Sequence, residues 1–205
     1  MSSVPQISKQ ETFQRIQRIQ TLTLIWMTVE AAISLAAAWM ARSPALLAFG
    51  GDSAIELLSA IVVLRLFRAP VENAQSEKYA ARIAAVLLFI LPAYVSAASV
   101  MALLGHSEPK TTYLGIAILM AAAAIMPWLA KEKRKLSAIT RSAALRADAA
   151  ESALCAYLSL VALVGLGVNA IWHFTWADPI AGLVIVPLIL REGWEAARGK
   201  PCGCC

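Results

Sequence analysis

Asp52 and Glu56 are two acidic residues in a stretch, residues 43–64, that contains no Lys or Arg. They are four residues apart, so on a helix they share one face and lie one turn apart. Two carboxylates with this spacing can bind one cation together. Because no basic residue is present to pair with them, we expect these acids either to be protonated or to receive a cation that comes and goes.

A second part of the chain repeats this pattern. The segment "DSAIELLSAIVVL" (52–64) aligns with "ESALCAYLSLVAL" (151–163), so that Asp52 corresponds to Glu151 and Glu56 to Cys155. Each copy presents two potential metal ligands at i and i+4. Three carboxylates and one thiolate suit zinc, and do not exclude cadmium, cobalt or iron, whereas magnesium or calcium would gain little from sulfur.

The elements that carry these residues are predicted to be membrane helices. Hydrophobic residues make up 60% of the 205 residues, and the mean hydropathy is +0.67, well above a soluble domain. About 20 apolar residues span the hydrocarbon core as a helix. Six windows without Lys or Arg have this length or nearly so: 19–41, 43–64, 83–108, 111–130, 147–172 and 177–190. We therefore predict an all-α membrane protein, a bundle of six transmembrane helices.

Basic residues gather on one side of this predicted bundle. Of the 18 Lys and Arg residues, only Arg42 and Lys110 fall on the other side. The positive-inside rule therefore places both termini in the cytoplasm. We divide the chain into a cytoplasmic amphipathic N-terminal segment (1–20), a transmembrane transport domain (21–192) and a short Cys-containing tail (193–205).

The densest basic run, "KEKRK" at 131–135, begins the longest predicted loop, residues 131–142. We interpret it as a cytoplasmic loop that determines topology, with contact to RNA or anionic lipid as the alternative. The net charge of +5 is then a signal of membrane topology. No nucleic-acid partner is expected.

The repeat places its two copies in helices 2 and 5, which would run in opposite directions. Inverted three-helix halves with a binding site near the midplane are a recurrent transporter plan. Glu56 lies nine residues before Arg65 and Glu151 lies ten residues after Arg141, each about 14–15 Å along a helix. We therefore expect Glu56 level with Glu151, Asp52 level with Cys155, and no Lys or Arg at the depth of these acids.

Further acids and thiols have less certain roles. Glu30 on helix 1 is interpreted as a proton carrier or as a group that hydrogen-bonds inside the bundle. Asp148, with Arg146, is interpreted as a gate or proton relay near the inner mouth. The tail contains Cys202, Cys204 and Cys205, for which capture of a soft metal, lipid attachment and no distinct role all remain open.

At these residues the chain resembles the cation diffusion facilitator (cation efflux) family, which exports divalent metals in exchange for protons. The resemblance is carried by three segments: "SPALLAFGGDSAIE" (43–56), "ALRADAAESALC" (144–155) and "WADPIAGLVIVPLILREGWEAAR" (176–198). It implies six helices, a ligand pair on each of helices 2 and 5, and a homodimer. Glu56, Glu151 and Cys155 depart from the zinc-type family pattern, which puts the identity of the metal in question. Few residues follow helix 6, so the chain resembles a branch that lacks the family's cytoplasmic domain.

These features together predict proton-coupled efflux of zinc or a similar divalent transition metal by a multi-pass protein, placed in the bacterial inner (plasma) membrane. One alternative is a membrane-bound metal sensor or donor that uses the tail cysteines, and another is a proton-linked carrier of a different cation. An enzyme is not expected, because neither GxSxG nor HExxH is present.

Overall fold

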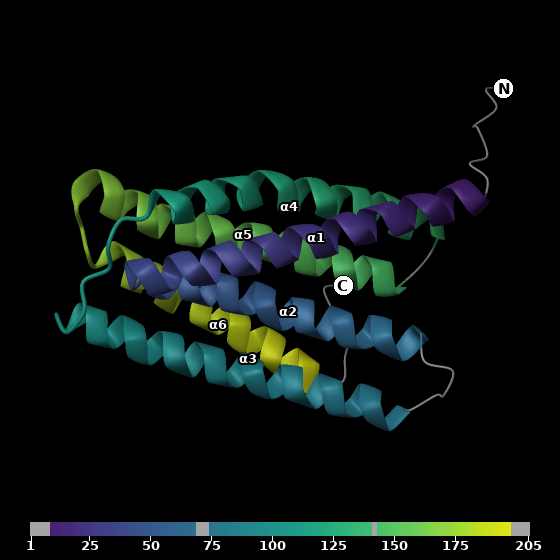
Figure 1. Ribbon diagram of the computed structural model, residues 1–205, viewed down its shortest axis with the longest axis horizontal. Coiled ribbons are helices and arrows are strands. Elements are labelled where there is room, and N and C mark those ends of the chain that lie inside the picture. Colours follow the sequence, from purple (N-terminus) through teal and green to yellow (C-terminus); the bar gives the residue numbers. More distant parts are fainter. Residues whose placement is uncertain (1–8, 69–73, 141–142, 198–205) are drawn as a thin grey trace.

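The computed structural model describes residues 9–68, 74–140 and 143–197, and these form six α-helices and no β-strand. The helices are α1 (Lys9–Ala41), α2 (Pro44–Arg68), α3 (Ala74–Leu103), α4 (Tyr113–Thr140), α5 (Ala143–Trp172) and α6 (Ala177–Ala197). Successive helices run in opposite directions along the long axis of the bundle (Figure 1). The two halves therefore have opposite orientations, α2 runs antiparallel to α5, and the all-α membrane bundle is confirmed.

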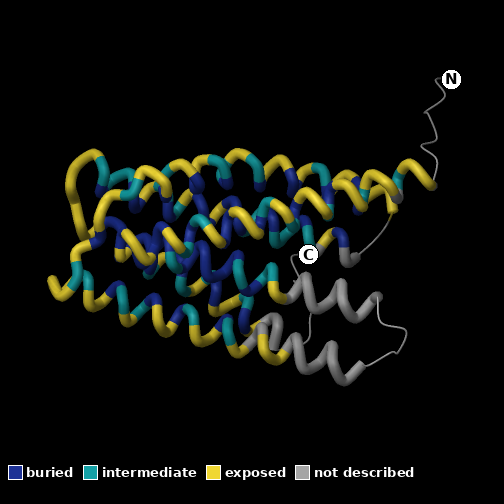
Figure 2. Tube along the Cα trace, viewed as in Figure 1, coloured by how far each residue is buried: buried dark blue, intermediate teal, exposed yellow. Residues whose placement is uncertain are grey.

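The surface of the bundle is apolar in the way that lipid requires. Within the residues that the structure describes, four segments are long and apolar enough to cross a membrane: 10–41, 86–103, 113–140 and 148–172. Only 22% of residues 86–103 are buried, although this segment has the highest mean hydropathy of the four. Its exposed face on α3 lies along one side of the bundle (Figure 2). An uninterrupted apolar face of this kind is stable only in hydrocarbon, so the chain is an integral membrane protein.

Helix α2 lies at the centre of the bundle. It contacts α1, α3, α5 and α6, whereas α4 packs against α5 and α1, and α3 packs against α6. The main core between these helices includes the fully buried side chains Leu46, Phe49, Leu119, Leu158, Ile185 and Ile189. Because α2 lies at the centre, its acidic residues are surrounded by the other helices.

The starts of α2 and α6 are joined at one end of the bundle. Ser43 precedes Pro44, and its Oγ accepts a hydrogen bond from the backbone N–H of Leu46 at 3.1 Å, as an N-cap does. The same hydroxyl donates to Asp178 Oδ1 at 2.7 Å. Asp178 also bonds to the backbone of Ala45. Through these contacts the Asp178 side chain, which belongs to the neighbouring α6, caps α2.

Two helices are longer than the sequence pattern indicated. Helix α4 continues to Thr140, so residues 131–140 are helical rather than a loop, because its buried stripe continues past Pro127 through Leu129, Lys133 and Leu136. Helix α1 begins at Lys9, so the end of the predicted N-terminal segment is continuous with the membrane helix. We call the end of the bundle where α1 begins, α4 ends and α5 begins the basic end.

Candidate metal centre

The two acids of α2 lie inside the bundle. Asp52 is fully buried, and Glu56 is half-buried one turn further along the helix. The pair directly follows Gly50 and Gly51, where an added Cβ would come within 2.7 Å of Ser34 and 2.6 Å of Leu91. These glycines allow α1 and α3 to approach α2 closely, which excludes water from the segment that carries the acids.

Cys155 of α5 completes a group of three candidate ligands. Its Sγ lies 3.8 Å from Glu56 Oε2 and 4.0 Å from the Ser53 hydroxyl. Ligand atoms of Asp52, Glu56 and Cys155 all lie within 4.8 Å of one another. Ligand atoms around one tetrahedral zinc ion, each about 2.0–2.3 Å from it, are about 3.3–3.8 Å apart, so a movement of about 1 Å would bring all three onto one ion.

Asp52 is the member of this group whose charge is least compensated. Among the described residues, neither of its oxygens accepts a hydrogen bond from an amide, hydroxyl or ammonium group. Its polar neighbour is the Glu192 carboxyl of α6, which lies within hydrogen-bonding reach. A buried carboxylate is strongly unfavourable without a positive partner, so this oxygen pair is well suited to bind a cation.

Glu151, the fourth ligand that the sequence suggested, lies one turn from Cys155 towards the basic end. It is half-buried and lines a cavity of about 60 Å³ together with Glu56, Cys155, Lys133 and Asp148. The expected register placed Glu151 level with Glu56. The structure places Cys155 beside both Asp52, as that register expected, and Glu56, whereas Glu151 lies outside this group of three.

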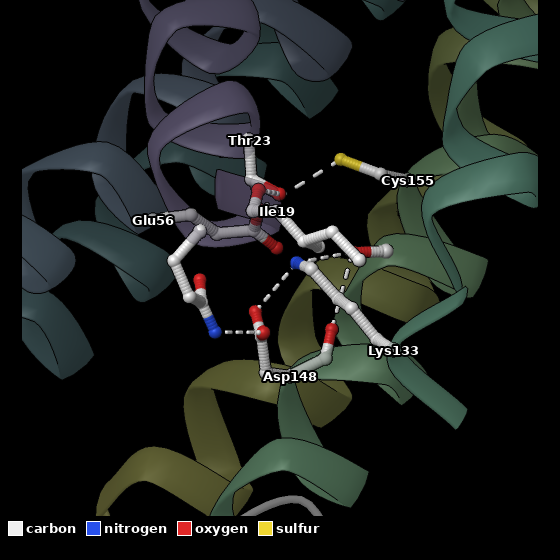
Figure 3. Close-up of polar contacts among 8 residues, drawn as sticks. Ile19, Thr23, Glu56, Lys133, Asp148 and Cys155 are labelled. Atoms are coloured by element: carbon white, nitrogen blue, oxygen red, sulfur yellow. Dashed lines mark hydrogen bonds and ion pairs between the residues drawn. The ribbon is translucent and has the colours of Figure 1, made fainter. Parts of the chain in front are cut away.

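Lys133 contradicts the expectation that no basic residue shares the depth of these acids. Its side chain is fully buried, and its Nζ lies 2.8 Å from Asp148 Oδ1 and 2.9 Å from Ser152 Oγ (Figure 3). Asp148 Oδ2 accepts a further hydrogen bond of 2.7 Å from Gln20 of α1. The basic run 131–135 is therefore not merely a topology-determining loop, since one of its lysines points into the acidic cavity.

The sequence did contain a signal for Lys133. The buried residues of α4 recur every three or four positions: Ile118, Leu119, Ala122, Met126, Leu129, Ala130, Lys133, Leu136 and Ser137. Extending this stripe beyond the apolar window would have placed Lys133 on the inner face of the helix. Glu192 had a weaker signal, an acid at the end of the last apolar run.

Glu30 lies next to the metal-ligand group but is already hydrogen-bonded. It is fully buried, and its two oxygens accept hydrogen bonds of 2.6 Å from Ser53 of α2 and from the Trp26 indole. It is therefore a neighbour of the three candidate ligands rather than one of them. Cys202, Cys204 and Cys205 lie outside the described residues.

A helical membrane bundle that encloses acids and a thiol at its centre defines a class of protein, the membrane carriers of cations. The sequence profile of the cation efflux transmembrane domain matches residues 21–199. No curated protein matches the chain significantly. The chain belongs to the cation efflux family, and it is a transmembrane cation transporter.

Proposed function

We propose that this protein exports a divalent transition metal, zinc or a similar ion, in exchange for protons. The observation that carries the proposal is the convergence of Asp52, Glu56 and Cys155 within 4.8 Å at the centre of the bundle. Two carboxylates and a thiolate favour zinc over magnesium or calcium, with cadmium, cobalt and iron as further candidates. Glu151, or water, supplies the fourth ligand.

The size of the cavity supports a metal over an organic cation. Its volume of about 60 Å³ has room for only a few water molecules. A bare or partly hydrated ion fits, whereas an organic ammonium compound would require the helices to separate. The small cavity therefore disfavours transport of an organic cation, the alternative that the sequence left open.

Proton coupling follows from the chemistry of the ligands. Carboxylates and thiols bind metal only when they are deprotonated, so metal and protons compete for the same atoms. Glu30 and Glu151 lie beside these atoms and are proposed to pass protons, while Asp148 is proposed to control access from the basic end. We place both termini and the basic end in the cytoplasm, since the sequence assigns nearly all Lys and Arg residues to the predicted loops and helix ends of that side.

Two further proposals concern the oligomeric state of the transporter and the membrane in which it lies. We propose a homodimer in the bacterial inner membrane, which is supported by the resemblance to the cation efflux family alone. The oligomeric state can be measured directly as the mass of the protein released from detergent micelles.

Transport is tested with the purified full chain in liposomes that contain a zinc-sensitive dye. We expect zinc flux that increases when the pH gradient is imposed in the antiport direction and that is lost in Asp52→Asn and Glu56→Gln. Glu108→Gln serves as the matched control, because Glu108 is exposed and lies on a loop between α3 and α4. Flux that ignores the pH gradient, or that persists in Glu56→Gln, contradicts the proposal.

The metal sensor or donor makes the opposite prediction. Its activity would depend on the tail cysteines, so deletion of residues 201–205 would abolish it while Asp52→Asn would not. For the transporter, we expect this deletion to leave zinc flux in liposomes nearly unchanged.

A further inference from the structure

Lys133 is a fully buried cation whose position is not explained by the packing of α4 alone. The other buried side chains of this helix are apolar or small, and a buried ammonium is strongly unfavourable unless it is paired. An apolar residue would continue the stripe without this penalty. The charge at this position therefore needs its own explanation.

The partners of Lys133 close the acidic cavity on the side of the basic end. Its ammonium group bonds to Asp148 and Ser152 of α5, and Asp148 in turn accepts a hydrogen bond from Gln20 of α1. The three helices α1, α4 and α5 thus meet through one hydrogen-bonded group around a single positive charge (Figure 3).

This group lies on the same face of α5 as the candidate metal ligand. Asp148, Ser152 and Cys155 are four and three residues apart, so they follow one another along the helix, and Asp148 is about 10 Å from Cys155 along the axis. All three line the same cavity, together with Lys133. A cation that moves from the basic end towards Cys155 passes the ammonium group.

We propose that Lys133 is a tethered competitor of the transported cation: its ammonium group occupies the basic-end half of the metal cavity, and a divalent ion reaches Asp52, Glu56 and Cys155 only when that group moves away. This inference rests on the proposed function and adds a residue that determines affinity and release. Two positive charges a few ångströms apart repel strongly in a protein interior, so the ammonium group and the ion cannot both remain in so small a cavity.

Asp148 provides the tether. The Lys133 side chain is 0% exposed, whereas that of Asp148 is 26% exposed, so the acid spans the boundary between the cavity and the outside. When metal enters, the ammonium group can turn towards the exposed side while it remains paired with Asp148. When the metal leaves, the ammonium group returns and disfavours rebinding from the same side.

Zinc titration of the detergent-solubilised full chain by calorimetry tests the proposal. We expect Lys133→Met, which removes the charge but keeps an unbranched side chain, to bind zinc at least about tenfold more tightly than the wild type. If the single variant folds poorly, the double variant Lys133→Met/Asp148→Asn replaces it, because it removes one positive and one negative charge together. We expect the same tighter zinc binding in the double variant. Lys131→Met is the matched control, because Lys131 is an exposed lysine two residues earlier on α4.

A second measurement separates a moving ammonium group from a fixed one. Lysine acetylation of the wild type, followed residue by residue by mass spectrometry, should show Lys133 protected without metal and labelled several times faster with zinc, relative to Lys131. Unchanged or weaker zinc binding in the variants overturns the proposal. Tighter zinc binding in the variants without any change in the labelling of Lys133 also overturns the proposal. In that case the repulsion of an ammonium group that stays in place would be sufficient to explain the weaker binding of the wild type. A wild type that binds no zinc contradicts the proposed function instead.

Discussion

The hydroxyl of Ser53 on α2 lies 2.6 Å from Glu30 Oε1 on α1, directly beside Asp52. The second oxygen of Glu30 accepts a hydrogen bond from Trp26 at 2.6 Å, so this fully buried carboxyl group has a donor on each side. The pairing holds a third acid next to the candidate ligands Asp52 and Glu56 and fixes its orientation. It also joins the two helices at the depth of the site.

Ser53→Ala removes the donor on α2 and leaves a buried carboxyl oxygen without its partner. We expect the free energy of unfolding in detergent to fall by about 1–3 kcal/mol. Ser159→Ala is the matched control, because Ser159 is equally buried but, among the described residues, bonds only to the backbone of its own helix, at Ala156. A loss for Ser53→Ala no larger than that for Ser159→Ala would show that the contact with Glu30 contributes little.

Cys155→Ser replaces the soft ligand atom with a hard one of similar size. We expect weaker binding of both zinc and cadmium, with the larger loss, at least about tenfold, for cadmium, because cadmium has the stronger preference for sulfur. Competitive titration of the two metals measures the ratio. A chain that lacks residues 202–205 should keep the wild-type ratio, and an unchanged ratio in Cys155→Ser would remove the thiol from the ligand set.

Gly50→Ala tests the close approach of α1 to α2. The added methyl group would lie 2.7 Å from Ser34 Cβ and 3.0 Å from the backbone of Leu35, so the helices must separate. We expect a loss of about 1–3 kcal/mol in the free energy of unfolding, together with weaker zinc binding.

Gly167→Ala is the control for this substitution. Apart from the adjacent backbone of its own helix, no atom of the described residues lies within 4 Å of the added Cβ at Gly167. Gly167 is also helical, so we expect no loss and a gain of up to about 1 kcal/mol. Equal effects of the two substitutions in a thermal unfolding experiment would argue against a packing role for Gly50.

Ser43→Ala tests the junction between α2 and α6. The substitution removes both the cap on Leu46 and the hydrogen bond to the buried Asp178, so we expect a loss of about 2–3 kcal/mol. Thr112→Ala removes a cap of the same kind at the start of α4, on Gly115. Within the described part of the chain Thr112 makes no side-chain hydrogen bond to another helix, so the expected loss is about 1 kcal/mol. Chemical unfolding of both variants in detergent measures the difference, and equal losses would contradict a role for the contact between the helices.

The class of the fold was readable from the sequence because lipid imposes a simple rule. Apolar windows of about 20 residues without Lys or Arg must be helices, since no other open structure satisfies the backbone in hydrocarbon. The pairing of Asp52 with Glu56 was readable for a similar reason. A separation of four residues places two side chains on one helix face whatever the rest of the protein does.

The tertiary structure alone decided which side chains meet. Cys155 rather than Glu151 lies against the acids of α2, because the register between two helices depends on how their side chains pack over many turns. Lys133 pairs with Asp148 inside the bundle because α4 continues past its apolar window and keeps the same inner face. Local sequence determines the face of a helix on which a residue lies, and packing between helices determines what that face meets.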